Sequence, residues 1–231
     1  MSSPCISAHS LFRLPFLGKT EVIYPSATQV TPMTIPKLIG PDDVSALIEV
    51  TNPGRDRLIL ALLFGTGARV GELVRTRLGD VDLDKGLIHL EADRTKTHQY
   101  RSVLIPPSLI PAIRTWLDNG PNGSRWLFPG RNPDRHITVR RIRQIVAQAA
   151  QNAGIQRVYA RDKNGRALNV VSPHTLRHSH AVAALDAGVP LNDIQDQLGH
   201  TNLATTSVYL RADISHRKKS YEKAGFEVEG L

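Results

Sequence analysis

An unbroken apolar run at residues 58–64 constrains the fold of this chain more than any other stretch. Together with Asp56 it predicts a helix over residues 56–64 without a polar face, and such a helix is stable only when other elements surround it. The run is far too short to cross a membrane. The chain therefore needs a core built around one buried helix, and 231 residues are enough to supply it.

Patterns on both sides of this run predict a mainly helical α+β domain, with helices around a small antiparallel sheet. Alternating residues over 86–91 and 101–105, the second ended by Pro106, predict a hairpin. Asn164-Gly165 predicts another hairpin within residues 157–171. Further helices are expected at residues 40–50 with Asp42 as the cap, at 68–74, 109–118, 138–152 and 214–224, and in two segments between 172 and 198.

Gly-Thr-Gly at residues 65–67 predicts a break after the buried helix. Arg69 follows at the mouth of the next helix, where the positive end of the helix dipole is unfavourable for a cation. This position suggests an anionic partner for Arg69, either Glu72 or a phosphate.

The stretch from residue 172 to residue 209 holds most of the residues with chemical potential. The Ser-Pro pair at its start predicts a capped helix, which places His174 and Arg177 on one face, a proton-transfer group beside a fixed cation. Gly199 is expected to end the next helix, and His200 lies in the corner beyond it.

These side chains suit chemistry on a phosphodiester. Charge on the non-bridging oxygens is stabilised by planar, permanently charged arginines, for which Arg69 and Arg177 are the candidates. Lys96, at the tip of the hairpin within residues 86–105, is the candidate donor of a proton to the leaving oxygen. Tyr209 is the candidate nucleophile.

A metal site is the alternative interpretation of the histidines. His174, His178 and His180 could serve as ligands, but no HExxH motif or carboxylate cluster accompanies them, and Arg177 would repel a cation. The single cysteine, Cys5, leaves no cysteine-rich metal site and no disulfide framework. We therefore expect neither a metal nor another cofactor.

Charge favours a nucleic acid as the partner. Lys and Arg number 29 against 21 Asp and Glu, a net charge of +8 at pH 7, which suits the phosphates of a polyanion. Arg140, Arg141 and Arg143 gather at the start of one predicted helix and are candidate DNA contacts. No membrane span or secretory signal is expected, and the cysteine usage suits the cytoplasm.

Five short motifs, from about residue 40 to Tyr209, resemble the catalytic motifs of the tyrosine recombinase (phage integrase) family and keep the family's order. They are Gly67-Ala68-Arg69-Val70-Gly71-Glu72-Leu73, Thr95-Lys96-Thr97, His174-Thr175-Leu176-Arg177-His178, Leu198-Gly199-His200 and Tyr209. The resemblance implies a site-specific DNA recombinase or integrase that breaks and rejoins DNA through a 3′-phosphotyrosyl intermediate, without a metal. It also implies a partner, double-stranded DNA with an inverted-repeat target site, and a homo-oligomer that is a tetramer on DNA.

Roles for the individual residues follow from the same resemblance. Arg69 and Arg177 hold the scissile phosphate, and His200 hydrogen-bonds it. Lys96 protonates the leaving 5′ oxygen, and Tyr209 attacks the phosphorus.

Two further positions have supporting roles by resemblance. His174 assists proton transfer at the nucleophile, and Glu72 orients Arg69 or His174 without taking part in the chemistry. His178 matches a position that is usually structural, and it is therefore left out of the predicted site.

Residues 1–36 have an irregular pattern and are expected to form a tail or linker, with residues 37–231 as the catalytic domain and a C-terminal helical tail. The helical core-binding domain that family members usually carry at the N-terminus is expected to be absent.

Two alternative functions would use the same kinds of residues, or only some of these residues. One is the nicking and closing of DNA, as in a type IB topoisomerase, and the other is DNA binding by a non-catalytic regulator derived from a recombinase.

Overall fold

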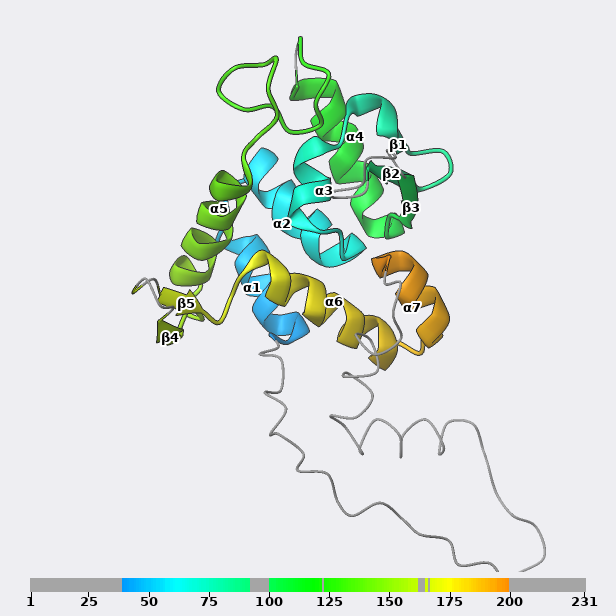
Figure 1. The fold of residues 1–231 in the computed structure, drawn as a ribbon. Helices are drawn as coiled ribbons and strands as arrows, with labels where there is room; N and C mark the ends of the chain where they lie inside the picture. Colours follow the sequence, from blue (N-terminus) through cyan, green and yellow to red (C-terminus); the bar gives the residue numbers. More distant parts are fainter. Residues whose placement is uncertain (1–38, 92–99, 122, 162–164, 166, 200–231) are drawn as a thin grey trace, which may run out of the picture. The chain divides into compact units, whose positions relative to one another are not determined.

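The computed structural model describes residues 39–91, 100–121, 123–161, 165 and 167–199, which all belong to one unit spanning residues 35–231. Within these ranges the fold is α+β and mainly helical, as predicted (Figure 1). The expectations for residues 1–36 and 214–224 lie outside the described residues. The α-helices are α1 (Pro41–Glu49), α2 (Arg55–Thr66), α3 (Val70–Arg75), α4 (Ile110–Asn119), α5 (Val139–Asn152), α6 (Pro173–Asp186) and α7 (Leu191–Leu198). The short 3₁₀ helices are η1 (Leu78–Asp80) and η2 (Pro107–Leu109), and the strands are β1 (Val81–Asp82), β2 (Leu87–Glu91), β3 (Tyr100–Leu104), β4 (Val158–Arg161) and β5 (Ala167–Asn169).

The apolar helix α2 forms the centre of the core, as its sequence predicts. All side chains of residues 58–63 are buried, and α1, α4, α5 and α6 pack around the helix (Figure 1). Burial of one Leu or Ile side chain contributes about 1.5–3 kcal/mol. This helix therefore fixes the positions of the elements that carry the candidate site.

The end of α2 differs from the prediction of a break over residues 65–67. The helix continues through Gly65 to Thr66, and the chain turns only at Gly67, whose φ of 63° lies in the left-handed region that favours glycine. A Cβ atom at Gly65 would lie 2.7 Å from Cδ1 of Leu109. Gly65 therefore permits a close approach of α2 to η2, and only Gly67 acts as the helix terminator.

The helix starts confirm one prediction and correct another. Ser172 caps α6 as predicted, because its Oγ accepts the backbone N–H of Thr175 at 3.2 Å. The prediction of Asp42 as the cap of α1 is wrong, since Gly40 is the N-cap and its N–H donates to the carboxylate of Asp43 at 3.1 Å. The acidic side chain acts from inside the first turn, where the helix dipole favours it.

The sheet has the antiparallel order β1-β2-β3, so the predicted hairpin of β2 and β3 is confirmed. Ile88 of β2 lies opposite Val103 of β3, and both side chains are buried against the helices. The third strand, β1, was not predicted, because two residues are too few to show an alternating pattern. The second predicted hairpin is also confirmed, since β4 pairs antiparallel with β5.

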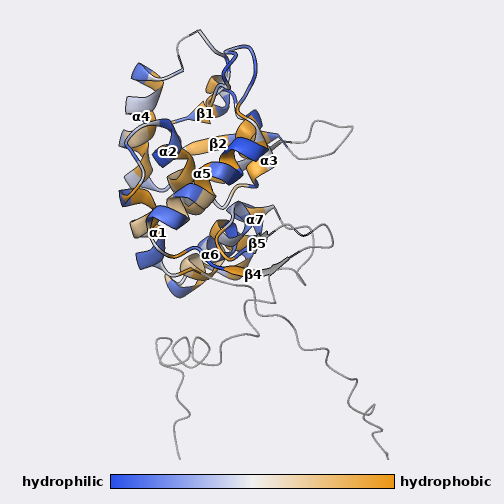
Figure 2. Cartoon of the chain, turned by 90° about the vertical axis from the view of Figure 1, so that its left-hand side faces the viewer, coloured by the Kyte–Doolittle hydropathy of each residue, from blue (hydrophilic) through white to orange (hydrophobic). Residues whose placement is uncertain are grey.

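Helix α5 lies at the surface and is strongly amphipathic. Its apolar positions, including Ile142, Ile145 and Val146, are buried against the core. Hydrophilic positions occupy the rest of the helix (Figure 2). None of the helices in the described ranges is both long and apolar enough to span a membrane.

Candidate active site

Arg69 is the N-cap residue of α3, which confirms its predicted place at the start of a helix. Its backbone N–H donates to Oε2 of Glu72 at 2.8 Å, and its Nη1 donates to Oε1 of the same carboxylate at 3.0 Å. Of the two anionic partners that the sequence suggested, Glu72 is in place. Glu72 thus holds Arg69 by both the backbone and the side chain.

Glu72 is itself buried, with 1% of its surface exposed, and it has a second cationic partner. Arg101 of β3 donates from Nη2 to Oε2 at 2.7 Å and from Nε to Oε1 at 3.2 Å. Burial alone raises the pKa of Glu72, but the hydrogen bonds and charges of Arg101 and Arg69 outweigh it, so that the pKa is lowered. The carboxylate is therefore ionised at neutral pH and lies between two guanidinium groups.

Arg177 of α6 is 5% exposed and reaches two other segments. Its Nη1 donates to the carbonyl of Gly67 at 2.5 Å, and its Nη2 donates to the carbonyl of Leu198 at 2.6 Å. Gly67 allows this close packing, since a Cβ atom there would lie 2.6 Å from Cδ2 of His180 and 2.7 Å from Cδ2 of Leu198. Arg177 therefore joins the end of α2 to the end of α7.

Three arginines from three elements converge on the last turn of α7, and we call Arg69, Arg101 and Arg177 the arginine cluster. They donate to three consecutive backbone carbonyls: Arg101 to Gln197, Arg177 to Leu198, and Arg69 to Gly199 at 3.1 Å. The carbonyl end of a helix carries partial negative charge, which favours cations. Gly199 ends α7 with a φ of 63°, as predicted, and this turn exposes the last carbonyls to the guanidinium groups.

His174 lies on α6, one helical turn before Arg177, on the exposed side of the helix. Its pKa is lowered, first by desolvation of the ring and then by the positive charges of Arg177 and Arg69. His174 and Arg177 are three residues apart on the same helix, and the charge of Arg69 contributes to the lowered pKa from another segment. A neutral imidazole at pH 7 can accept a proton.

His178, which was interpreted as structural, contacts His174 directly. The two Nε2 atoms are 2.6 Å apart, and the ring planes are nearly perpendicular, with centroids separated by 4.0 Å. A hydrogen bond at this distance requires that one nitrogen carries a proton and that the other accepts it. His178 therefore restricts the tautomer and orientation of His174, which the spacing of the sequence motif does not reveal.

His180 of α6 is half-buried. Its ring packs edge-on against Phe64, with centroids 6.4 Å apart. Burial is the main cause that lowers its pKa to about 4, and the charge of Arg177 adds to it, against a hydrogen bond with the backbone of Phe64. Among the described residues, no group of three His, Cys, Asp or Glu side chains is arranged to hold a metal ion.

The remaining predicted site residues, Lys96, His200 and Tyr209, lie outside the described residues. Lys96 belongs to the connection between β2 and β3, and His200 directly follows Gly199 in the sequence. Their predicted places in the site therefore stay predictions.

The exposed arginines of α5 stand apart from the arginine cluster. Arg140, Arg141 and Arg143, which we call the α5 arginines, lie in the first turns of α5, where Arg141 is 3.5 Å from Asp56. Figure 1 places α5 and α7 on opposite sides of α2. The arginine cluster and the α5 arginines thus lie apart in the structure, although the sequence analysis assigned residues of both groups to one partner, DNA.

Arg101 is the member of the cluster that sequence reasoning missed. Its strand was predicted, but the residue was given no role. Alternation along β3 puts Arg101 on the same face as the buried Val103. A cation at an inward position of a strand needs a buried anion, and this signal was available in the sequence.

Comparisons with known proteins give a consistent result. Residues 37–216 match the family described as the phage integrase family. A tyrosine recombinase XerA of Thermococcus kodakarensis is 36% identical over 197 residues, which are 84% of this chain and 64% of that relative. The crystal structure of XerA recombinase has 27% identity and a TM-score of 0.69 over 87% of this chain and 68% of that one. A structure of XerH site-specific recombinase bound to palindromic difH substrate, at 22% identity, has a TM-score of 0.64 over 86% of this chain and 55% of that one.

The chain spans about 64% of the length of the Thermococcus kodakarensis relative. The match includes α3 with its N-cap Arg69, β3 with Arg101, α6 with Arg177 and the end of α7, which are the elements that build the arginine cluster. By the family match and the similarity of its fold, this chain belongs to the phage integrase family of tyrosine recombinases.

Proposed function

We propose that this protein is a site-specific DNA recombinase that breaks and rejoins DNA strands through a 3′-phosphotyrosyl intermediate. The observation that supports the proposal is the arginine cluster, in which guanidinium groups from the N-cap of α3, from β3 and from α6 are fixed at one helix end, with His174 one helical turn before Arg177. Glu72 forms ion pairs with Arg69 and Arg101 of this cluster, and the guanidinium group of Arg177 adds a third positive charge to the same site. A site of that charge suits a phosphate whose negative charge grows during the reaction.

The proposed reaction uses the residues in the following way. The Oη of Tyr209 forms a bond to phosphorus as the bond from phosphorus to the 5′ oxygen breaks. His174 takes part in removing the tyrosine proton, and Lys96 gives a proton to the leaving 5′ oxygen. Arg69 and Arg177 stabilise the charge on the non-bridging oxygens, and no metal is required for that purpose.

We further propose that His200 donates a hydrogen bond to the same phosphate and that residues 37–231 form the catalytic domain. Rejoining is the reverse reaction, in which a 5′ hydroxyl attacks the phosphotyrosine. The bond energy is conserved in the covalent intermediate, so strand exchange needs no external energy source.

The proposed partner is double-stranded DNA that carries an inverted repeat, bound by a tetramer of the chain. The XerH relative was crystallised with a palindromic substrate, which supports a target of this kind. The α5 arginines are proposed to contact the phosphate backbone, since they are exposed and close together on one helix.

The test uses nicked duplexes made from any inverted repeats that a search of the DNA on both sides of the gene identifies. Cleavage next to the nick releases a short fragment, so the covalent protein–DNA adduct cannot be resealed and is visible on a denaturing gel. We expect an adduct with the wild type and none with Tyr209→Phe, which lacks only the nucleophilic oxygen. An adduct formed by the Phe variant would show that the nucleophile is wrongly assigned.

A plasmid assay separates recombination from simple nicking and closing. Recombination requires two target sites on the DNA, whereas relaxation of a supercoiled plasmid without a target site would indicate a topoisomerase-like activity. Specific binding without cleavage of any repeat would instead indicate a non-catalytic regulator.

A further inference from the structure

We propose that Arg101 is a positioning residue of this site, which acts through Glu72 to fix the guanidinium group of Arg69 toward the scissile phosphate. The inference rests on the proposed function, because it assigns Arg69 to the phosphate. Arg101 itself is not expected to contact DNA.

The hydrogen bonds of Glu72 carry the first step of the argument. Oε1 accepts from Nη1 of Arg69 at 3.0 Å and from Nε of Arg101 at 3.2 Å. Oε2 accepts from the backbone N–H of Arg69 at 2.8 Å and from Nη2 of Arg101 at 2.7 Å. Each oxygen thus accepts one hydrogen bond from each arginine, and these four bonds fill the hydrogen-bonding capacity of the carboxylate. Rotation of the carboxylate breaks bonds to both arginines at once, so Arg101 restricts the orientation of Arg69.

Burial separates the roles of the two arginines. The side chain of Arg69 is 40% exposed, whereas that of Arg101 is 16% exposed and that of Glu72 is fully buried. All three nitrogens of the Arg101 guanidinium have protein acceptors, two on Glu72 and one on the carbonyl of Gln197. Arg69 therefore keeps surface for a ligand, and Arg101 is committed to the protein.

Close packing fixes the stem of Arg101 as well. A Cβ atom at Gly199 would lie 2.6 Å from Cδ of Arg101, so the absence of a side chain at this turn makes room for the arginine. The stem therefore passes directly under the turn whose carbonyl binds Arg69 at 3.1 Å. Arg101 and Arg69 consequently both contact the turn at the end of α7.

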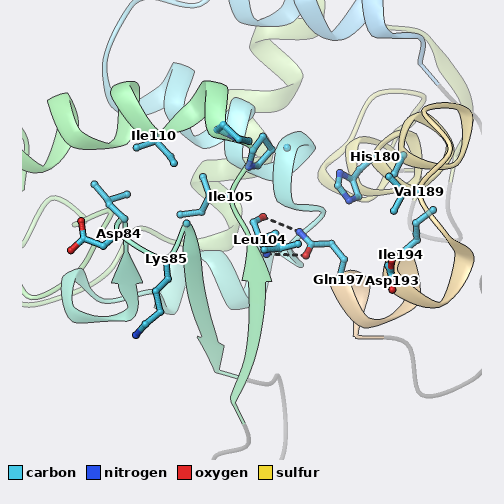
Figure 3. A pocket seen from close by; sticks show the side chains of 16 residues that line it. Asp84, Lys85, Leu104, Ile105, Ile110, His180, Val189, Asp193, Ile194 and Gln197 are labelled. Atoms are coloured by element: carbon cyan, nitrogen blue, oxygen red, sulfur yellow. Dashed lines mark hydrogen bonds between the residues drawn. The ribbon is translucent and has the colours of Figure 1, made fainter.

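Gln197 anchors the strand from which Arg101 extends. Its side-chain oxygen accepts the N–H of Leu104 at 2.9 Å, and its side-chain nitrogen donates to the carbonyls of Leu104 at 3.0 Å and Thr66 at 3.1 Å. Figure 3 shows the two hydrogen bonds between Gln197 and Leu104 beside an apolar cavity whose lining includes both residues. An edge strand normally leaves such groups to solvent, so Gln197 takes the place of a neighbouring strand and fixes β3 to α7.

The test compares Arg101→Met with Arg101→Lys, Glu72→Gln and the double variant Glu72→Gln/Arg101→Met. Arg114→Met, on the exposed face of α4, is the matched control. Circular dichroism and thermal unfolding first identify a temperature at which all variants are folded. The double variant keeps the test possible if Arg101→Met does not fold, because it removes the buried carboxylate charge together with its partner.

The first readout is the single-turnover rate of adduct formation on the nicked duplex, with the DNA affinity measured separately. We expect Arg101→Met to lower the rate of adduct formation about 100-fold, because the guanidinium group of Arg69 would be displaced from the scissile phosphate and a displacement of about 1 Å has an effect of this size. Arg101→Lys should recover part of this loss, because it keeps a charge but not the paired geometry. The double variant should be no slower than the slower of the single variants, because both substitutions interrupt the same path from Arg101 to Arg69.

The second readout is the affinity for inorganic sulfate, followed by NMR, which needs no tyrosine chemistry. We expect Arg101→Met to weaken sulfate binding about 10-fold, the effect of losing one well-aligned charged hydrogen bond. If the wild type forms no adduct, the proposed function fails while the sulfate measurement still decides the role of Arg101. Unchanged sulfate affinity in folded Arg101→Met, or rate losses that add in full in the double variant, would overturn the inference.

Discussion

Two regions of this molecule use arginine under opposite conditions. In the arginine cluster, the guanidinium groups bind backbone carbonyls and a buried carboxylate, and each is held by an element of the core. The α5 arginines are exposed on one helix, and the ion pair of Arg141 with Asp56 is long, at 3.5 Å. The comparison teaches that an arginine with several fixed hydrogen-bond acceptors holds its guanidinium group in one orientation. An exposed arginine with few such acceptors instead provides a positive charge that attracts the DNA.

A substitution of Arg by Lys in each region tests this comparison most directly, because it is expected to give the largest difference between the two regions. Arg177→Lys should lower the rate of adduct formation about 100- to 1,000-fold, because an ammonium group cannot bind two carbonyls and a phosphate in the same plane. Arg143→Lys should change the rate by less than about twofold, since an exposed charge is retained. Single-turnover kinetics on the nicked duplex measure both variants. Equal losses in the two variants would remove the distinction between the regions.

The converse experiment removes the charge of the α5 arginines by changing all three to Gln. DNA affinity at low salt should fall roughly 10- to 100-fold, and the slope of log affinity against log salt should decrease by about 1 for each phosphate that is no longer neutralised. At saturating DNA the rate of adduct formation should fall less than about threefold, because the contribution is to binding. Arg114→Gln on α4 is the control. A large loss in the rate at saturation would assign these residues to the chemistry.

The smallest expected effect concerns the pKa of His174. This pKa is lowered by desolvation, then by the charges of Arg177 and Arg69. Arg69→Gln removes one positive charge that disfavours the imidazolium form, so the pKa of His174 should rise toward its ordinary value of 6.5. NMR titration of the imidazole measures the change, and Arg141→Gln on α5 should leave the titration as it is in the wild type. A shift of the same size from both variants would mean that the pKa reports net charge and not proximity.

Local signals in the sequence were sufficient for much of the fold. The apolar run predicted the buried helix α2, and the Ser-Pro pair predicted the start of α6. Gly199 predicted the end of α7. Each of these features depends on neighbouring residues only, so short-range physical rules apply to it. The place of Arg69 at a helix mouth was predictable for the same reason.

Contacts between distant segments were not predictable in this way. Arg101 lies 29 positions from Glu72 and 96 from Gln197 in the chain, so no local pattern reports their contacts. The glycine at position 65 looked like a helix breaker, but its use is a close approach to Leu109. The contact of His178 with His174 depends on side-chain rotation, which residue spacing does not specify.

The three consecutive carbonyls at the end of α7 make the arginine cluster a single mechanical unit. Because Gln197, Leu198 and Gly199 belong to one rigid helical turn, a tilt or slide of α7 moves the anchors of all three arginines together. Each arginine also has an acceptor outside α7, which is Glu72 for Arg69 and Arg101 and the carbonyl of Gly67 for Arg177. The cluster therefore connects α7 to the ends of α2 and α3, and a displacement of this one short helix would change one attachment of all three arginines at the same time.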